Sequence, residues 1–569
     1  MAFEVLRGWC SRVLPKRKPR RRRVRGGFGR ASELLEGRAL LSSSPAAFVV
    51  DVPHDISAPD GVTTLREAVD QANNHVGTDI VSFAPGIGSL ISLAQPGPIE
   101  ILEDLTIDGP GQSSLSVHGV VSYDVFTVGT GVTATIQDIT LISTGYGTIE
   151  SDGVSLTIKD STIKINPMVP FATDSNIVNR LGDLTIDGTW VEGIGHNTIS
   201  NGGGIFHTGG GTLTITNGST IHHHNAGVAG GGIYNDGSIV RIDHSTISRN
   251  STTSSIDLGT GAVFQWPFLE PPDETPCDPA FDDSDSSGSG SGGGLYNNGG
   301  RVEITHTTFN DNRSHFDGGA ILSIGVAGTY NGVAELEIID STFNCNRVAF
   351  GMGGAIANID GTGKSIVDLG LYPPLPTEYG YSTFERNIAE EGGGAIFNLS
   401  ELTLFNSTIS NNRARGMAPM TSGDGGGIYQ GITGFSDILF VTFARNDAAG
   451  RGGALHVEDF GIVDVDLTHS LFAFNPAIGK NGKNDVSDPG SRIDYFCVNL
   501  FQAPPLLDLD YNITPPHIPP TRTHALPGGH PAIDRGCWDP EVDQRHYLRT
   551  NREDVGSYEG GASSAPHPW

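Results

Sequence analysis

A glycine-rich tetrapeptide that recurs along the chain limits its possible folds more than any other sequence feature. Gly-Gly-Gly or Gly-Gly-Ala precedes Ile or Leu in eight copies, which end at Ile205, Ile233, Leu295, Ile321, Ile356, Ile396, Ile428 and Leu455. Successive copies are 28, 62, 26, 35, 40, 32 and 27 residues apart. Such a period is typical of a solenoid, because a unit too small to bury its own apolar face buries it against the next unit.

A second motif runs in phase with the first. Phe or Ile stands three residues before an asparagine in seven copies, at Asn250, Asn312, Asn346, Asn387, Asn412, Asn446 and Asn475. Short alternating segments such as 240–243, 302–305 and 402–404 precede most copies, and each is predicted to be a strand with one inward apolar residue. Stacking at about 4.8 Å would place these asparagines in a ladder, where each amide donates to and accepts from its neighbour.

The paired Gly-Gly-Ala-Ile and Phe-x-x-Asn motifs resemble the repeats of the chlamydial polymorphic outer-membrane proteins, a family of surface adhesin-like β-helices. With the repeats, this resemblance implies an all-β chain folded as a right-handed parallel β-helix, the solenoid of pectate lyases. The solenoid is expected over residues 111–476, and about 12 coils are expected between residues 105 and 476. A shared fold does not by itself identify an activity.

Residues 1–45 are predicted to be a basic export leader. Residues 1–38 hold 12 Lys and Arg against 3 Asp and Glu, a net charge of +9, and the basic run 16–23 lacks the apolar segment of a standard signal peptide. A solvated tail or a nucleic-acid patch is the alternative. The stretch 35–42, Leu-Glu-Gly-Arg-Ala-Leu-Leu-Ser, resembles the LEPR-XLL segment of large exported proteins of planctomycetes and related bacteria, with Gly37 in place of proline.

Residues 46–110 are predicted to cover the start of the solenoid. A short amphipathic helix is expected over 64–73, with Leu65, Ala68, Val69 and Ala72 on one face, and strands are expected at 80–83, 90–93 and 105–107. The first coil of a solenoid has an exposed edge that another element must cover. The segment resembles the CSLREA module of bacterial parallel β-helix proteins, with Thr63-Thr64 where that module has Cys-Ser.

Residues 477–569 are predicted to form a C-terminal cap. The stretches 530–536, 543–549 and 554–559 resemble the segment called choice-of-anchor Q, which follows β-helix repeats and usually precedes a sorting signal. His546 and Ser557 depart from that pattern, and no sorting signal follows Glu559. The abundant Asp and Arg residues are interpreted as charge pairs that shield the last coil edge, with a catalytic cluster as the alternative.

The spacing of 62 residues indicates an insert at 256–291, whose Asp, Ser, Gly and Pro content predicts a solvated loop or at best a weak calcium loop. The five cysteines show no Cys-x-x-Cys or Cys/His metal spacing, so a zinc site is not expected. Cys497 and Cys537 could pair in an oxidising compartment, or they could be two unrelated thiols. The sequence contains no run of 18 apolar residues, so no transmembrane helix is predicted.

Two segments invite a chemical interpretation. Asp243-His244 resembles a short stretch near the pectate lyase calcium site. Its equivalents in other repeats are taken as 305–306, 340–341 and 406–407, and because these hold ordinary turn residues, Asp243-His244 is interpreted as a turn. The run His222-His223-His224 could offer at most two ligands to one metal, and it is interpreted as a solvent-facing turn. Neither a Gly-x-Ser-x-Gly elbow, a phosphate loop nor a dinucleotide fingerprint is present.

These observations predict an exported structural or adhesin-like protein of the cell surface, the outer membrane or the extracellular space, without an identified catalytic site. The net charge is −29, and subtracting the +9 of residues 1–38 leaves −38 for the body, which disfavours nucleic acid and suits neutral glycans or cell-envelope components as partners. No cofactor is expected apart from Ca²⁺ as a possibility. The alternative is a lyase or glycoside hydrolase acting on polysaccharides, which needs two or three close carboxylates or a base beside calcium.

Overall fold

The computed structural model describes residues 44–569 except 57, 59, 166–174, 194–196, 199–200, 253–276, 278–289, 328–332, 370–380, 417–421, 479–484, 491, 497–498, 504–505, 507–508, 512–521, 528–529, 534–554 and 556–569. The chain divides into two units, Met1–Ser42 and Ser43–Trp569. Several predicted features therefore lie outside the described residues. They are the LEPR-XLL-like stretch, Cys497 and Cys537, most of the insert, and most of the choice-of-anchor-like stretches.

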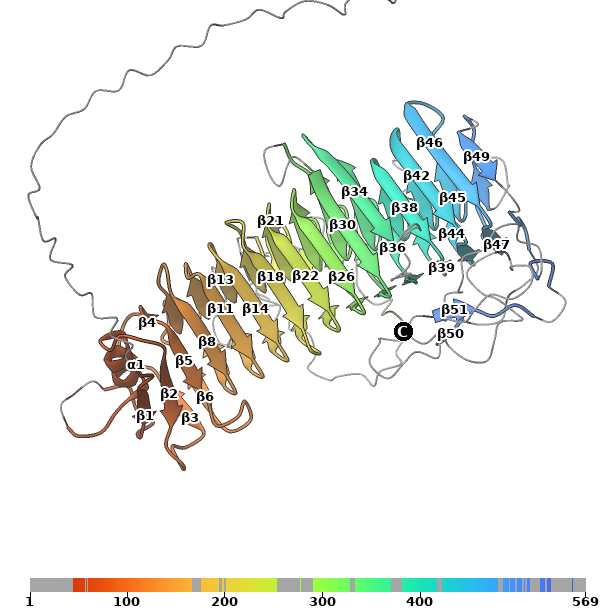
Figure 1. The fold of residues 1–569 in the computed structure, drawn as a ribbon. Coiled ribbons are helices and arrows are strands. Elements are labelled where there is room, and N and C mark those ends of the chain that lie inside the picture. Colours follow the sequence, from red (N-terminus) through yellow and green to blue (C-terminus); the bar gives the residue numbers. More distant parts are fainter. Residues whose placement is uncertain are drawn as a thin grey trace, which may run out of the picture. The chain divides into compact units, whose positions relative to one another are not determined.

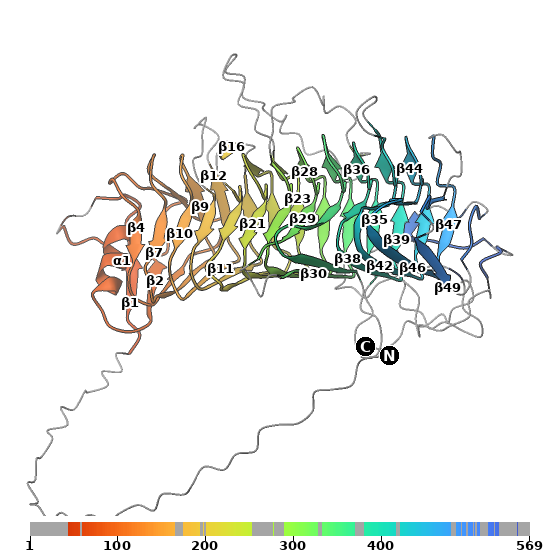
Figure 2. The ribbon, with the colours of Figure 1, turned by 90° about the horizontal axis from the view of Figure 1, so that it is seen from above.

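The second unit is a stack of coils in which successive strands of each sheet run parallel (Figures 1 and 2). From β13 to β44, each coil passes in turn through four sheets, named C, A, B and D. In the described residues the longest sheet, sheet A, has 15 strands. They are β1 (Ala47–Val50), β2 (Asp79–Phe83), β5 (Leu105–Asp108), β8 (Thr133–Gln137), β11 (Ser155–Lys159), β14 (Asp183–Asp187), β18 (Thr212–Thr216), β22 (Ile239–Asp243), β26 (Arg301–Thr305), β30 (Val333–Ile339), β34 (Lys364–Leu369), β38 (Glu401–Phe405), β42 (Thr433–Leu439), β46 (Ile462–Thr468) and β49 (Ile493–Phe496).

Sheet B follows sheet A in each coil. Its described strands are β3 (Leu90–Ser92), β6 (Ser116–His118), β9 (Thr140–Ser143), β12 (Thr162–Ile165), β15 (Trp190–Glu192), β19 (Thr220–His222), β23 (Thr246–Ser248), β27 (Thr308–Asn310), β31 (Thr342–Asn344), β35 (Thr383–Glu385), β39 (Thr408–Ser410), β43 (Thr442–Ala444) and β47 (Leu471–Ala473). The short strands of sheet D come next: β16 (Asn197–Thr198), β20 (Asn225–Ala226), β24 (Ser251–Thr252), β28 (Arg313–Ser314), β32 (Arg347–Val348), β36 (Ile388–Ala389), β40 (Arg413–Ala414) and β44 (Asp447–Ala448).

Sheet C closes the coil, and eight of its described strands begin at the Ile or Leu that ends the glycine-rich motif. Its described strands are β4 (Ile99–Ile101), β7 (Phe126–Val128), β10 (Ile149–Ser151), β13 (Ile177–Asn179), β17 (Ile205–His207), β21 (Ile233–Asp236), β25 (Leu295–Asn298), β29 (Ile321–Gly325), β33 (Ile356–Asp360), β37 (Ile396–Asn398), β41 (Ile428–Gln430), β45 (Leu455–Val457) and β48 (Val486–Ser487). The fold is a right-handed parallel β-helix, so the predicted fold class is confirmed.

The insert does not interrupt the register of the coils. Although 62 residues separate them, Ile233 pairs with Leu295, and Asn235 with Asn297, as directly as in coils without an insert. The strand positions expected from the repeats are confirmed as well, since the segment 302–305 falls within β26 and 402–404 within β38.

The inward side chains form one continuous core along the solenoid. In sheet B one residue per strand faces inward, and the rings of Phe309, Phe343 and Phe384 stack with centroids 5.0 and 4.8 Å apart. Sheet A differs, because β26 buries both Val302 and Ile304. The expectation of one inward residue per strand is therefore wrong for sheet A, since a five-residue strand points its second and fourth side chains inward. Each fully buried aliphatic or aromatic side chain contributes about 1.5–3 kcal/mol.

The first glycine of each tetrapeptide permits the turn into sheet C. Gly230, for example, has a φ of +65°, in the left-handed region that L side chains rarely adopt. The second glycine is required for a different reason, because a Cβ on Gly354 would lie 2.2 Å from the carbonyl oxygen of Gly394 in the next coil. Both glycines therefore allow coils to stack closely at this corner.

A single described helix, α1 (Leu65–Asn73), covers the start of the core. Thr64 caps it, with Glu67 completing a capping box, and the buried face consists of Leu65, Ala68, Val69 and Ala72. The amphipathic helix predicted at this position is confirmed. No helix in the described part of the chain is long and apolar enough to cross a membrane.

The solenoid extends beyond both predicted limits, 111 and 476. Strands β2 to β5 already belong to sheets A, B and C, and at the other end β48 pairs with β45 and β49 with β46. Leu500 forms a bridge to Leu471 beside the last strand of sheet B. These outer coils lack the repeat motifs; the strands expected at 80–83, 90–93 and 105–107 are confirmed as β2, β3 and β5, whereas β48 and β49 are identified by their backbone pairing.

The chain that follows lies against the outer face of sheet B. The strands β50 (Leu509–Tyr511) and β51 (Arg522–His524) pair in antiparallel fashion, and His524 Nε2 lies 2.8 Å from Ser410 Oγ in β39. A small apolar cluster joins Leu506, Leu526 and Val555 to sheet B. The described residues of the predicted C-terminal cap therefore continue the solenoid and cover one side of it.

Candidate functional site

The seven asparagines of the Phe-x-x-Asn motif stand directly above one another along the edge between sheets B and D. All are at most 1% exposed. Each Nδ2 donates to the Oδ1 of the next asparagine at 2.9–3.1 Å, and to a carbonyl oxygen of the preceding coil at 2.8–3.1 Å. The Oδ1 also accepts from the backbone N–H of the preceding asparagine at 2.9–3.2 Å. This asparagine ladder therefore satisfies its buried amides internally, which is a structural role.

Different residues occupy the two ends of the asparagine ladder. At one end the backbone N–H of His224 donates to Asn250 Oδ1, while His224 Nε2 lies 3.0 Å from the carbonyl oxygen of Val191. At the other end Asn475 Nδ2 donates to Asp485 Oδ1 at 3.0 Å. Both end residues are buried.

The solvent-facing position expected for residues 222–224 is therefore wrong for His224, which takes the place of a ladder asparagine. Burial lowers the pKa of His224 to about 3. Its neighbours His222 and His223 lie with their Nδ1 atoms 2.7 Å apart, and burial followed by the charge of His223 lowers the pKa of His222 to about 4. His222 and His224 thus favour the neutral state.

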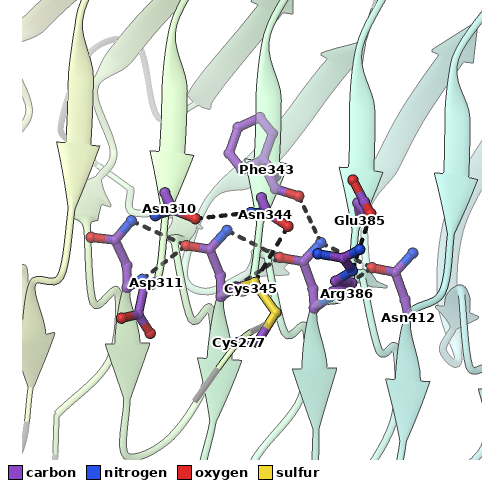
Figure 3. Close-up of a disulfide and its surroundings, with 12 residues drawn as sticks. Cys277, Asn310, Asp311, Phe343, Asn344, Cys345, Glu385, Arg386 and Asn412 are labelled. Carbon is purple, nitrogen blue, oxygen red and sulfur yellow. Dashed lines mark hydrogen bonds and ion pairs between the residues drawn. A yellow bond between two sulfur atoms is a disulfide. The ribbon is translucent and has the colours of Figure 1, made fainter. Parts of the chain in front are cut away.

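The residue before each ladder position turns the chain out of sheet B. His223, Arg249, Asp311, Cys345, Arg386, Asn411, Arg445 and Phe474 all have φ between 53° and 58°. Cys345 forms a disulfide with Cys277, which lies in the predicted insert (Figure 3). The disulfide ties the insert to the ladder turn of a neighbouring coil. Nothing in the cysteine spacing distinguished this pair, because the two residues are 68 positions apart.

A second left-handed turn joins sheets A and B. Its residues are Asp138, Asp160, Asn217, His244, His306, Asp340, Asn406, Phe440 and His469, with φ between 45° and 56°. Thr305 pairs with Asp243 and with Ile339, so the expected equivalence to 340–341 and 406–407 is wrong by one residue. The left-handed residue fixes the alignment, and His244 corresponds to His306, Asp340 and Asn406.

Three chemically active groups meet at this second turn. Asp243 Oδ2 lies 2.8 Å from His244 Nδ1, and Asp243 Oδ1 lies 3.0 Å from His306 Nδ1. Thr305 Oγ1 donates to Asp243 Oδ1 at 2.6 Å. Burial alone would raise the pKa of Asp243, but the hydrogen bonds from His306, Thr305 and His244 outweigh it and hold the pKa below its ordinary value.

A buried polar cluster lies at sheet C near the far end of the solenoid. Asp424 is paired with Arg451 at 2.9 Å, and His456, which is fully buried, has Nε2 3.8 Å from Asp424 Oδ2 and 3.9 Å from Glu458 Oε1. Tyr429 donates a hydrogen bond to Glu458. Burial lowers the pKa of His456, and burial together with Glu458 raises the pKa of Tyr429. Asp424 and Arg451 form the close ion pair of the cluster, whereas neither ring nitrogen of the buried His456 has a hydrogen-bond partner among the described residues.

Carboxylates gather on the outer face of sheet A at the same end. Asp437, Asp466 and Asp494 are neighbours on adjacent strands, and one oxygen each of Asp464, Asp466 and Asp494 lie within 4.8 Å of one another. Burial and the charges of Asp437 and Asp464 raise the pKa of Asp466. Close carboxylates are one of the two arrangements that a polysaccharide-cleaving site requires.

One family comparison matches this chain. The Chlamydia polymorphic membrane protein repeat matches residues 381–399 and 406–430. The first segment contains β35, β36 and β37, and the second contains β39, β40 and β41. Neither a curated protein nor a solved structure matches the chain.

Proposed function

We propose that this protein is an exported, structural or adhesin-like surface protein whose solenoid presents its outer faces to partners. The observation that carries the proposal is the repeat match, since the two matched segments fall on successive coils around the asparagine ladder. Proteins of the matched family are described as polymorphic membrane proteins. The ladder of side chains joins successive coils by hydrogen bonds, which is a structural role that involves no substrate.

The disulfide supports the export part of this proposal. Cys277 and Cys345 are bonded, and disulfides persist mainly in oxidising compartments outside the cytoplasm. The resemblance of residues 1–45 to a leader and of residues 530–559 to an anchoring segment agrees with this location. Surface glycans or cell-envelope components are the partners that suit an acidic body.

The location is tested by labelling intact cells that produce the protein with a membrane-impermeant biotin reagent. We expect lysines of the solenoid to be labelled in intact cells as strongly as in lysed cells. Labelling only after lysis would contradict export. The binding role is tested on a glycan array with the purified chain, scored for retention and for product release, and we expect retention without release.

A polysaccharide-active enzyme remains a second candidate because of the carboxylates at Asp464, Asp466 and Asp494. For that candidate, product release from polygalacturonate or alginate with calcium should disappear in Asp466→Asn. The double variant D243N/H244Q should leave any such activity unchanged, because these two residues lie on another part of sheet A. Loss of product release in D243N/H244Q would instead support a lyase centred on that turn.

A further inference from the structure

The turn between sheets A and B brings together two histidines that lie 62 residues apart in the chain. His244 and His306 each stand six residues before a ladder asparagine, Asn250 and Asn312. Because those asparagines are adjacent rungs, the two histidines occupy the same corner of adjacent coils. Their rings stack with centroids 4.4 Å apart and an interplanar angle of 28°.

The carboxylate of Asp243 bridges the Nδ1 atoms of the two imidazoles. Its two oxygens approach His244 Nδ1 and His306 Nδ1 at 2.8 and 3.0 Å. One ligand atom from each of the three side chains lies within 4.8 Å of the others. The side chains are 44%, 35% and 24% exposed for Asp243, His244 and His306, so the cluster is accessible from solvent while its geometry is held by two strands.

We propose that Asp243, His244 and His306 bind a divalent transition-metal ion of the Zn²⁺ type. Zinc binds imidazole nitrogen at about 2.0–2.1 Å and carboxylate oxygen at about 2.0–2.2 Å, which places ligand atoms of a tetrahedral site about 3.3 Å apart. The observed nitrogen–oxygen separations are a few tenths of an ångström shorter. A small rotation of the exposed side chains therefore makes room for the ion, which replaces the protons now shared between imidazole and carboxylate.

The ligand types select zinc over calcium. Two of the three groups are imidazoles, which suit zinc, copper and nickel, whereas calcium takes six to eight oxygen ligands. Three protein ligands leave at least one coordination position open to water or to a partner's side chain. This inference goes beyond the proposed surface role and does not depend on it.

Asp340, in the next coil, would orient one of the ligands once the metal is bound. Its Oδ1 accepts from the backbone N–H of Tyr381 at 3.1 Å, and its Oδ2 lies 3.6 Å from His306 Nε2. A proton on Nε2 facing this carboxylate leaves the Nδ1 lone pair of His306 for the metal. Carboxylates that hold metal-binding histidines in this way commonly raise metal affinity about 10- to 100-fold.

The test is titration of the chelator-treated full-length protein with Zn²⁺ and, separately, with Ca²⁺ by isothermal calorimetry. We expect one high-affinity Zn²⁺ per chain and no Ca²⁺ binding at this position. The double variant H244N/H306N should weaken Zn²⁺ binding at least about 100-fold, and Asp340→Asn about 10-fold. Asparagine is chosen because Asn406 occupies the same left-handed turn, so folding is preserved. Circular dichroism and the metal-free melting temperature verify this.

The matched control is H222Q/H223N, which alters the other pair of adjacent histidines and should leave Zn²⁺ binding unchanged. Cobalt substitution supplies an independent readout, since its visible absorption bands should be present in the parent and absent from H244N/H306N. Equal Zn²⁺ affinity in the parent and H244N/H306N overturns the proposal. Loss of binding in H222Q/H223N, no binding by the parent at 100 μM Zn²⁺, and Ca²⁺ in place of Zn²⁺ each overturn it as well.

Discussion

In each coil, the residue that takes the left-handed conformation at a turn and the buried residue that follows it differ in what they demand of a side chain. In seven successive coils, the residue after the left-handed turn between sheets B and D is asparagine. This residue is buried, and its amide must donate to and accept from its neighbours along the stack. The turn between sheets A and B holds Asp, Asn, His and Phe at the same backbone angle. A position that completes a buried hydrogen-bond chain is uniform, whereas one that needs only a positive φ is free to vary and can acquire chemistry.

The largest effect should come from removing a rung in the middle of the uniform ladder. Asn346→Ala removes the hydrogen bonds that Asn346 Oδ1 accepts from the backbone N–H and the Nδ2 of Asn312, and those that its Nδ2 donates to the Phe309 carbonyl and to Asn387 Oδ1. We expect a loss of about 3–5 kcal/mol in the free energy of unfolding, measured by urea denaturation.

The control for this variant is Asn344→Ala, which removes the same side chain two residues earlier. Asn344 donates one hydrogen bond to Asn310 and is only partly buried, so we expect less than about 1 kcal/mol. Equal losses in the two variants would contradict the special role of the ladder.

The disulfide at the ladder turn should rank second. It closes a segment of 68 residues, and removal of a bond of this kind typically costs about 2–4 kcal/mol. We expect Cys277→Ser and Cys345→Asn to lower the urea midpoint equally, since both only open the bond. A thiol titration under denaturing conditions adds a second result: of five cysteines, two in the disulfide leave three free, and a value of one would show that two of Cys10, Cys497 and Cys537 pair as well.

Acid should distinguish the His224 end of the ladder from its asparagine rungs. The folded protein keeps His224 neutral down to a pKa of about 3, while the unfolded chain takes up a proton near pH 6.5. Its contribution to stability is therefore complete above pH 6.5 and declines as the pH falls toward 3, at up to about 1.4 kcal/mol per pH unit. At pH 5 we expect His224→Asn to gain about 1–2 kcal/mol relative to the parent, compared with pH 7.

Denaturation series at pH 5, 6 and 7 measure this difference. The exposed His54→Gln is the control, and it should follow the parent at each pH. If the free energies of unfolding of the parent and of His224→Asn changed equally with pH, His224 would not be a buried histidine that stays neutral in the folded protein.

The smallest effect should come from the variable turn. His306→Asn keeps a residue suited to positive φ, and we expect the metal-free unfolding free energy to change by less than about 0.5 kcal/mol. A loss above about 2 kcal/mol would show that this left-handed position, too, is constrained by structure, and its contrast with the ladder asparagine would fail.

The sequence predicted the fold well because the repeat specifies its own strands. The strand expected at 302–305 is β26, and the helix expected at 64–73 is α1, since periodic apolar residues and a capping threonine are local signals. The strands expected at 80–83, 90–93 and 105–107 are β2, β3 and β5, whereas the C-terminal outer coil escaped prediction, because β48 and β49 carry neither motif. The strands β48 and β49 form by pairing with β45 and β46, which no local pattern reveals.

The candidate site was only half visible in the sequence. Asp243-His244 and Thr305-His306 were recognised as equivalent, but their approach across a 62-residue spacing depends on the insert leaving the stack without shifting the register. An equal distance of six residues to the ladder asparagine was the signal that could have joined them. The partner of Cys345 had no such signal, because it lies in a segment outside the repeat.

The asparagine ladder also has a direction. Every amide-to-amide hydrogen bond of the ladder runs from a donor to an acceptor in the next coil toward the C-terminal end of the stack, and bonds in such a row polarise one another. The positive end of this row meets the carboxylate of Asp485, and the negative end meets the backbone N–H of His224. A coil duplicated in the middle of the ladder keeps this direction. A coil added after Asn475 would need a new acceptor in the place that Asp485 now takes at the end of the ladder. The length of such a solenoid can therefore change in its interior more easily than at its ends.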